Sequence, residues 1–178
     1  MSSEPRIVSN FNYRVMAAYL RFRERFRKPD HMIESLGIGQ GDFVLDFGCG
    51  IGSYAIPTAK RVGSSGRVYA LDIHPMAIER VQKRVKKEGL TNIETILSGL
   101  ETGLADESLD YILLFDVYTW IPNKRPLLKE LSRILKSTGK MSVLIDHTNP
   151  EEFINDLRCY GFFNIEIQDD NFFTLSKK

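Results

Sequence analysis

The sequence is poor in cysteine and has no long apolar run, and each shortage excludes a class of protein. Only two cysteines, Cys49 and Cys159, occur among 178 residues, which indicates reduced thiols in a cytoplasmic protein rather than a disulfide framework. No apolar run approaches the roughly 18 to 20 residues that a membrane span needs. The first residues, Met1 to Pro5, lack the apolar core of a signal peptide, so export is not expected.

Charge of one sign is not in excess either. The chain has 24 Lys and Arg against 23 Asp and Glu, a formal net charge of +1, so no overall electrostatic argument supports DNA as a partner. Basic residues nevertheless cluster before the first expected strand, at Arg21, Arg23, Arg25, Arg27 and Lys28. Acidic residues crowd the tail, at Glu151, Glu152, Asp156, Glu166, Asp169 and Asp170. This pattern fits two solvated faces, or a basic segment that meets an acidic substrate, a membrane surface or the acidic tail.

The sequence does contain a glycine-rich segment directly after an apolar run. Gly48, Gly50 and Gly52 lack β-carbons where the backbone must turn sharply and lie against a ligand. Asp72 stands 20 residues beyond Gly52, at the end of the next apolar run. A ribose-binding acid is expected at that place. Together these features predict a cofactor that contains a nucleoside.

Apolar periodicity and turn residues predict alternating helices and strands. Helices are expected over residues 10–28, 31–36, 53–62, 75–89, 123–135 and 151–160, with Pro57 kinking the third or confining its regular part to the last turns. Strands are expected over residues 43–47, 67–73, 93–97, 111–115, 140–145, 164–168 and 172–175. In the first helix, apolar residues recur every three or four positions, at Phe11, Val15, Ala18, Phe22 and Phe26.

Repeated alternation of this kind predicts a parallel sheet with helices on both faces, closed by a hairpin that adds one antiparallel strand. In such sheets ligands bind beyond the carboxyl ends of the strands, beside the first strand. The glycine turn and Asp72 fall at that edge. So do the residues that follow the later strands, namely Ser98, Gly99, Phe115, Asp116, Asp146 and His147.

Two nucleoside cofactors compete for the glycine turn. A dinucleotide site prefers G-x-G-x-x-G, where helix amides meet a pyrophosphate. This chain has D-x-G-x-G-x-G, with Asp46 just before the first glycine. A carboxylate there repels a phosphate but suits S-adenosylmethionine (SAM), which carries a sulfonium and an amino group. The spacing therefore favours SAM over NAD.

Four segments in order resemble the class I SAM-dependent methyltransferases, and the pattern is closest to their small ubiquinone- or menaquinone-biosynthesis-like branch. The segments are V-L-D-F-G-C-G-I-G (44–52), V-Y-A-L-D-I-H-P (68–75), D-E-S-L-D-Y-I-L-L-F-D-V (106–117) and L-L-K-E-L-S-R-I-L-K-S-T-G-K (127–140). The resemblance covers most of the chain. It implies a Rossmann-like α/β fold with a seven-stranded, mostly parallel sheet of order 3-2-1-4-5-7-6, the last strand antiparallel, and helices on both faces.

The resemblance also implies how the turn holds the methionine half of SAM. Asp46 would orient the methionine end, with Phe47 in the same turn and the amides of Gly48 and Gly50 lying close to it. Further along the chain, two residues after the fourth strand would line the same half, namely Phe115 and Asp116. For Asp116 a solvated loop carboxylate is the alternative.

For the adenosine half, the resemblance implies that Asp72 accepts both ribose hydroxyls and that Ile73 packs on the adenine. The alternative for Asp72 is to cap the following helix. The family often has an acid after the third strand, whereas this chain has Ser98 and Gly99. Adenine recognition would then rest on Ser98 or on the amide of Gly99.

No catalytic residue and no metal ligand is assigned from the sequence. Methyl transfer from a sulfonium mainly requires alignment of the acceptor and exclusion of water, and a base only where the acceptor is protonated. Asp146 and His147 form the one candidate acid–base pair, although His147 suits a structural role equally well. Tyr118 and Trp120 are expected either to pack in a lid or to form an aromatic wall for the substrate.

The expected function is methyl transfer to a small-molecule acceptor, with S-adenosylhomocysteine as the product. An Asn/Asp-Pro-Pro-aromatic motif for nucleic-acid amino groups is absent after the fourth strand. One domain is expected, residues 1–178, with a helical lid over 1–36 and a SAM-binding core over 37–178. Either the lid covers the site alone or a second subunit of a homodimer helps. The alternatives are a silent SAM-binding sensor or partner subunit, and a protein or tRNA methyltransferase.

Overall fold

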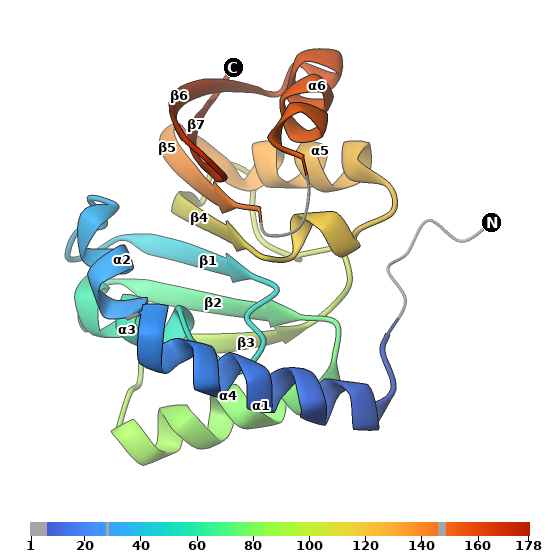
Figure 1. Ribbon diagram of the computed structural model, residues 1–178. Helices are drawn as coiled ribbons and strands as arrows, with labels where there is room; N and C mark the ends of the chain where they lie inside the picture. Colours follow the sequence, from blue (N-terminus) through green and yellow to red (C-terminus); the bar gives the residue numbers. More distant parts are fainter. Residues whose placement is uncertain (1–6, 28, 146–148) are drawn as a thin grey trace. The chain divides into compact units, whose positions relative to one another are not determined.

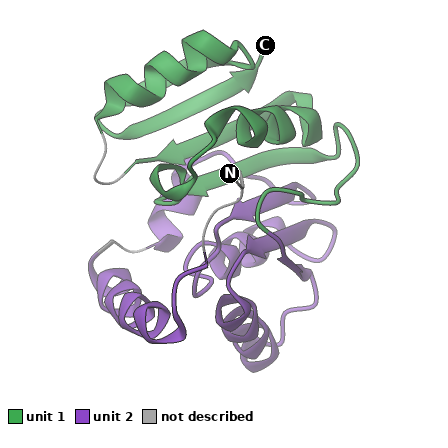
Figure 2. Cartoon of the chain, turned by 90° about the vertical axis from the view of Figure 1, so that its right-hand side faces the viewer, with its two compact units in different colours: residues 1–5, 99–178 green, residues 6–98 purple. Residues whose placement is uncertain are grey.

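The computed structural model describes residues 7–27, 29–145 and 149–178, and the chain divides into two compact units (Figures 1 and 2). Unit 2 comprises residues 6–98, and unit 1 comprises residues 1–5 and 99–178. The prediction of one domain with a lid over residues 1–36 stays a prediction. Among the described residues, no helix is long and apolar enough to cross a membrane.

Unit 2 is a three-stranded parallel sheet with helices between its strands. Its elements in chain order are α1 (Asn10–Arg27), α2 (Pro29–Ser35), β1 (Phe43–Phe47), α3 (Ala55–Val62), β2 (Arg67–Asp72), α4 (Pro75–Glu88) and β3 (Ile93–Leu97). Strand β2 pairs in parallel with β1 on one side and with β3 on the other. Phe47 lies opposite Leu71, and Asp72 lies opposite Leu97. The register therefore brings the carboxyl ends of β1 and β2 to the same edge.

The ends of the helices in unit 2 follow from single residues. Pro75 begins α4, at a position where a backbone N–H would have no partner within the helix, so proline loses nothing there. Gly89 ends the helix with a φ of 66°. Helix α3 begins at Ala55, two residues later than expected. Pro57 consequently lies in the first turn of α3, a position that tolerates proline. Proline therefore has no reason to kink this helix.

Unit 1 is a mixed sheet that ends in an antiparallel hairpin. Its elements are β4 (Leu109–Phe115), a 3-10 turn η1 (Tyr118–Trp120), α5 (Lys124–Ile134), β5 (Leu135–Leu144), α6 (Pro150–Tyr160), β6 (Phe163–Asp169) and β7 (Phe172–Lys177). Strands β4 and β5 are parallel, and β7 is antiparallel to both β5 and β6. The order is β3-β2-β1 in unit 2 and β4-β5-β7-β6 in unit 1, which together give the predicted strand order.

Strand β5 begins five residues earlier than the sequence predicts. It starts at Leu135, directly after α5, rather than at Lys140. Its pairing with β4 is irregular, since Leu109 lies opposite Leu135 while Tyr111 lies opposite Lys140. A β-carbon on Gly139 would come within 2.6 Å of the Leu135 side chain. Gly139 thus allows a close approach inside an irregular strand.

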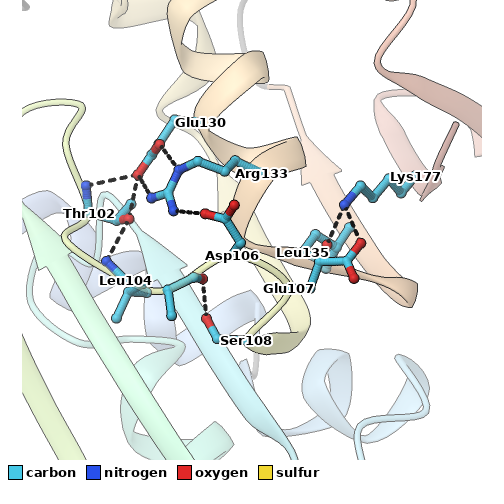
Figure 3. A network of polar contacts seen from close by, with 10 residues as sticks. Thr102, Leu104, Asp106, Glu107, Ser108, Glu130, Arg133, Leu135 and Lys177 are labelled. Carbon is cyan, nitrogen blue, oxygen red and sulfur yellow. Dashed lines mark hydrogen bonds and ion pairs between the residues drawn. The ribbon is translucent and has the colours of Figure 1, made fainter.

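A polar network in unit 1 fixes the loop between β3 and β4 (Figure 3). The Glu130 carboxylate accepts hydrogen bonds from the backbone N–H of Thr102 (3.2 Å) and from its hydroxyl (2.6 Å). Arg133 binds both oxygens of Glu130, at 2.7 and 2.8 Å, and reaches Asp106 at 2.5 Å. Arg133 and then Thr102 hold the pKa of Glu130 well below its usual value, at about 2.

Replacing Glu130 by Gln should destabilise the chain by about 1 to 2 kcal/mol at neutral pH, because the bidentate bond to the partly exposed Arg133 is lost. The pKa of Glu130 is lower in the fold, about 2, than its ordinary 4.5. Its contribution is therefore complete above pH 4.5 and is lost as the pH falls toward 2. Urea unfolding at several pH values measures this difference.

The matched control is Glu107→Gln. Glu107 is another carboxylate of the same loop, and it pairs with Lys177 at 2.8 Å, but its side chain is 56% exposed. Removing an exposed pair should cost less than about 0.5 kcal/mol. Equal losses in the two variants would show that the Glu130 network does not hold the loop.

Candidate cofactor site

The glycine turn after β1 is tied to β2 through the backbone. The N–H groups of Gly48 and Cys49 both donate to the carbonyl of Leu71, at 2.8 and 2.9 Å. Gly48, Gly50 and Gly52 have φ values of 80°, 54° and 80°. Residues with a β-carbon rarely adopt this left-handed region. The three glycines are therefore what allows the chain to turn here.

The structure brings the turn and Asp72 into direct contact. The N–H of Gly50 donates to one carboxylate oxygen of Asp72 at 2.9 Å, and the N–H of His74 donates to the other at 2.8 Å. Each oxygen can accept more than one hydrogen bond, so the carboxylate keeps capacity for hydroxyl donors. Helix α4 is capped by His74 rather than by Asp72, because Nδ1 of His74 accepts from the Met76 N–H at 3.2 Å.

Asp46 is the most deeply buried carboxyl group at this edge. Its exposed fraction is 2%, and the amide of Ala55 hydrogen-bonds to it. Its Oδ2 atom has no hydrogen-bond partner among the described residues. Burial, and secondarily the charge of Asp72, raise the pKa of Asp46 from 3.8 to about 7 against the opposing bond from Ala55. A buried carboxylate oxygen without a partner suits a cationic group of a ligand.

The sequence reasoning missed Tyr13, which lies against the turn. Its side chain is fully buried, and its hydroxyl donates to the carbonyl of Gly50 at 3.3 Å. Its ring stacks on His74 with 4.2 Å between the ring centroids. Burial and the charge of Asp72 raise the pKa of Tyr13, so the hydroxyl stays protonated and remains a donor. The spacing of Tyr13, Ala17 and Leu20 was the signal available in the sequence.

His74 and Arg84 complete the support of the turn. Because Nδ1 of His74 accepts from Met76, the ring proton lies on Nε2, which donates to the carbonyl of Val8 at 3.2 Å. Arg84 on α4 donates to the carbonyl of Ile51 at 3.1 Å and pairs with Glu24 on α1 at 3.0 Å. Helices α1 and α4 therefore both hold the turn.

Neither cysteine forms a disulfide, as predicted. Cys49 lies buried in the glycine turn, while Cys159 on α6 is exposed. Burial first, and then the charges of Asp46 and Asp72, raise the pKa of the Cys49 thiol well above its usual value. The thiol therefore stays protonated and contributes small apolar volume rather than a nucleophile.

The remaining predicted cofactor residues divide between the two units. Phe47 is buried at the end of β1, Ile73 is half-buried, and the N–H of Ser98 donates to the Asp72 carbonyl at 3.1 Å, all in unit 2. Unit 2 therefore joins most of the predicted set at one edge. Three predicted residues belong to unit 1: Gly99, Phe115 and Asp116. Contact with the cofactor stays a prediction for the whole set.

At the end of β4 in unit 1, the backbone is strained. Asp116 has a φ of 60°, and its N–H donates to the Leu144 carbonyl at 2.9 Å. A non-glycine residue in this region costs free energy and is found preferentially at functional sites. Phe115, just before it, is buried and lies 6.3 Å from the ring of Phe172.

The aromatic residues after β4 have different environments. Tyr118 is buried, donates to Asp156 at 2.7 Å and meets the ring of Phe153 edge-on at 4.7 Å. These contacts support the packing role for Tyr118 rather than a substrate wall. Trp120 is 73% exposed. The candidate acid–base pair, at positions 146 and 147, lies outside the described residues.

The glycine turn and its two carboxylates lie together at the edge of a Rossmann-like sheet, where the sequence predicts a nucleoside cofactor. A family model for a methyltransferase domain matches residues 45–143, so the chain belongs to this family. The match begins in β1 and extends into β5. It confirms the predicted class, a class I SAM-dependent methyltransferase, and SAM as the predicted cofactor.

Relatives that are similar to the chain are named as methyltransferases of particular acceptors. The demethylmenaquinone methyltransferase of Geobacillus kaustophilus is 28% identical over 143 residues, which cover 80% of this chain and 61% of that protein. The aklanonic acid methyltransferase DauC of a Streptomyces species is 34% identical over 103 residues, covering 57% of this chain and 47% of that protein. The chain thus spans about three-fifths of the length of the first of these relatives.

Solved structures confirm the predicted fold class. A SAM-dependent methyltransferase from Methanococcus maripaludis, described as putative, superposes with a TM-score of 0.81 at 20% identity, covering 100% of this chain and 97% of that one. A SAM-dependent methyltransferase from Aquifex aeolicus gives a TM-score of 0.75 at 24% identity, covering 87% and 91%. At these identities the likeness establishes the fold.

Replacing Asp46 by Asn should remove a loss of stability that the wild type shows as the pH rises. The pKa of Asp46 is raised in the fold from 3.8 to about 7, so the folded chain holds a proton that the unfolded chain releases in this range. Stability therefore falls as the pH rises from 3.8 to about 7. Relative to the variant, the ligand-free wild type should lose about 3 kcal/mol between about pH 5 and pH 8.

Urea unfolding of both proteins at the two pH values gives this difference directly. Using the difference between the two proteins cancels the titration of all other groups. A wild-type-minus-variant difference that is the same at both pH values would contradict the burial of an unsatisfied carboxyl at this position.

Proposed function

We propose that the protein transfers the methyl group of SAM to a small-molecule acceptor and releases S-adenosylhomocysteine. The observation that carries the proposal is the buried Asp46, with one oxygen lacking a partner among the described residues, at the same edge as Asp72 and the glycine turn. A carboxylate in this position matches a ligand that bears positive charge. It disfavours a pyrophosphate, which would bring further negative charge to the turn.

The chain's own groups divide the binding task. Ionised Asp46 would pair with the ammonium group of the methionine end, beside the glycine turn. Asp72 offers the second acceptor site of each oxygen to the two ribose hydroxyls, while Gly50 and His74 hold the carboxylate in place. When bound, SAM supplies the activated methyl carbon. Tyr13 supports the turn at Gly50, which favours a covering role for residues 1–36.

The acceptor that we propose is a reduced quinone or a related small aromatic molecule. The support is that several relatives are named demethylmenaquinone methyltransferase and one is named for aklanonic acid. In the reaction, the bond from the methyl carbon to sulfur breaks as a bond to the acceptor forms. The acceptor loses its proton to solvent or to a base.

SAM should bind to the wild type, and substitutions at the two carboxylates should weaken this binding. Asp72→Asn should raise Kd at least tenfold, since a loss of about 1.5 kcal/mol in hydrogen bonding to a charged group corresponds to about that factor. Asp46→Asn should also raise Kd, and should remove the increase in affinity that we expect as the pH rises to about 7. Isothermal titration with SAM and S-adenosylhomocysteine measures each quantity.

The control variant is Asp169→Asn, at the exposed end of β6 in unit 1, which should leave both affinities unchanged. Circular dichroism and thermal unfolding separate loss of binding from loss of folding. A wild type that binds neither ligand would refute the proposal, as would unchanged binding in both site variants.

Turnover should be seen with a reduced demethylated naphthoquinone that has a short side chain, and less with simple phenols. Formation of S-adenosylhomocysteine and the mass of one added methylene on the acceptor are the readouts. Aklanonic acid belongs in the same panel because of the second kind of relative. Asp72→Asn should lower turnover through the apparent KM for SAM.

Binding of SAM without turnover of any acceptor in the panel would instead favour a silent SAM sensor or partner subunit. Co-purification with a protein or tRNA that becomes methylated would contradict a small-molecule acceptor.

A further inference from the structure

The outer face of α1 carries large apolar side chains that are exposed in the structure. The exposed fraction is 73% for Phe11, 63% for Phe22 and 71% for Phe26. Val15 and Tyr19 are each 57% exposed. Soluble proteins seldom leave so many large apolar groups together in contact with water without a binding role.

These residues form one continuous stripe, which we call the α1 stripe: Phe11, Val15, Ala18, Tyr19, Phe22 and Phe26. At about 100° per residue, they fall within a sector of about 100° along the helix. Two apolar residues that precede α1 are also exposed, Ile7 by 58% and Val8 by 41%. A stripe of this width is enough to make a helix amphipathic.

The opposite side of α1 is fixed to unit 2, so the helix cannot rotate to hide the stripe. Tyr13 and Ala17 are fully buried and pack with Ile51 of the glycine turn and Ala77 of α4. Further along the helix, Glu24 pairs with Arg84 of α4 at 3.0 Å. Turning the stripe inward would break these contacts. Figure 1 shows α1 (blue) lying along α4 within this unit.

Arginines border the stripe on both sides. By the same helical geometry, Arg14, Arg21 and Arg25 lie along one border, and Arg23 lies along the other. The single acidic residue of α1 is Glu24, and it faces inward, where Arg84 binds it. The outer half of the helix therefore combines aromatic and aliphatic groups with positive charge only.

We infer that the α1 stripe docks the protein on an anionic lipid surface. Aromatic side chains of an interfacial helix insert at the boundary of headgroups and acyl chains, while long basic side chains reach back to the phosphates. Each basic residue near such a surface strengthens binding roughly fivefold. Three arginines along one border of the stripe and Arg23 along the other match a plane of phosphate groups, which meets both borders at once.

The acidic tail of a second copy is a weaker match for this surface. Glu166 on β6 already pairs with Lys140 of β5 at 3.1 Å. Docking of α1 there would also have to bury the arginines of at least one border away from water, which is costly unless each is paired. A lipid surface leaves these side chains in the hydrated headgroup layer.

Vesicle co-sedimentation tests the inference on the full chain. Binding to vesicles of phosphatidylcholine with about one-third phosphatidylglycerol should be at least tenfold tighter than binding to phosphatidylcholine alone, and should weaken as salt is added. The double variant Phe22→Ser/Phe26→Ser should bind anionic vesicles at least tenfold more weakly. Arg21→Gln/Arg25→Gln should lose a similar factor on anionic vesicles only.

Two matched controls carry the same chemical changes elsewhere. Ile165→Ser/Ile167→Ser removes two exposed apolar side chains from β6, and Lys86→Gln/Lys87→Gln removes two exposed charges from α4. Both should bind vesicles like the wild type. The stripe variants should keep the wild-type affinity for SAM and the wild-type thermal unfolding, so this test does not depend on the proposed methyl transfer.

Three results would overturn the inference. The first is equal binding, or no binding, to neutral and anionic vesicles. The second is unchanged vesicle binding in the Phe22→Ser/Phe26→Ser variant. The third is self-association in sedimentation velocity that the stripe variants abolish while vesicle binding persists, which would assign the α1 stripe to a second copy of the chain.

Discussion

The two hydrogen bonds that the Asp72 carboxylate accepts, from Gly50 and from His74, join three pieces of unit 2 at one point. They connect the glycine turn after β1 to the end of β2 and to the start of α4. Helix α1 then docks on the same point, because Tyr13 both donates to Gly50 and stacks on His74. The group expected to bind ribose is therefore also a structural group, so a substitution at Asp72 must be judged by ligand affinity and by folding together.

Burying two carboxyl groups at one edge makes the ligand-free site electrostatically unfavourable. Burial is the main cause of the raised pKa of both carboxyl groups, and the charge of Asp72 raises the pKa of Asp46 further. A ligand that brings a positive charge to Asp46 and hydroxyl donors to Asp72 relieves both costs, whereas a pyrophosphate would add to them. The two buried carboxyls therefore favour a ligand of that kind over a pyrophosphate, and their burial costs stability in the ligand-free fold.

The sequence predicted most elements because apolar period and turn residues agree along most of the chain. Strand β1 and helix α4 begin and end close to the expected residues, since the glycine turn, Pro75 and Gly89 mark their ends. The start of β5 was wrong by five residues because Gly139 serves a close approach to Leu135, which depends on pairing with β4. Tyr13 was missed for a similar reason, since its partner Gly50 is 37 residues away. The local sequence pattern does not predict contacts between residues that are far apart in the chain.

Helix α1 has apolar residues at helical spacing on two different faces, one exposed and one buried. The stripe that marks it as a helix in the sequence is the exposed side, while the buried side is the shorter set around Tyr13 and Ala17. Tertiary contacts, and not apolar content, decide which side faces inward. The consequence is spatial: the inner side of α1 touches the glycine turn, and its outer side carries the stripe, so about one helix diameter, roughly 10 Å, separates them. A helix docked on lipid would hold the cofactor turn close to the headgroups. An acceptor of quinone type is lipophilic, so the two proposals, though tested separately, require the same location for the reaction.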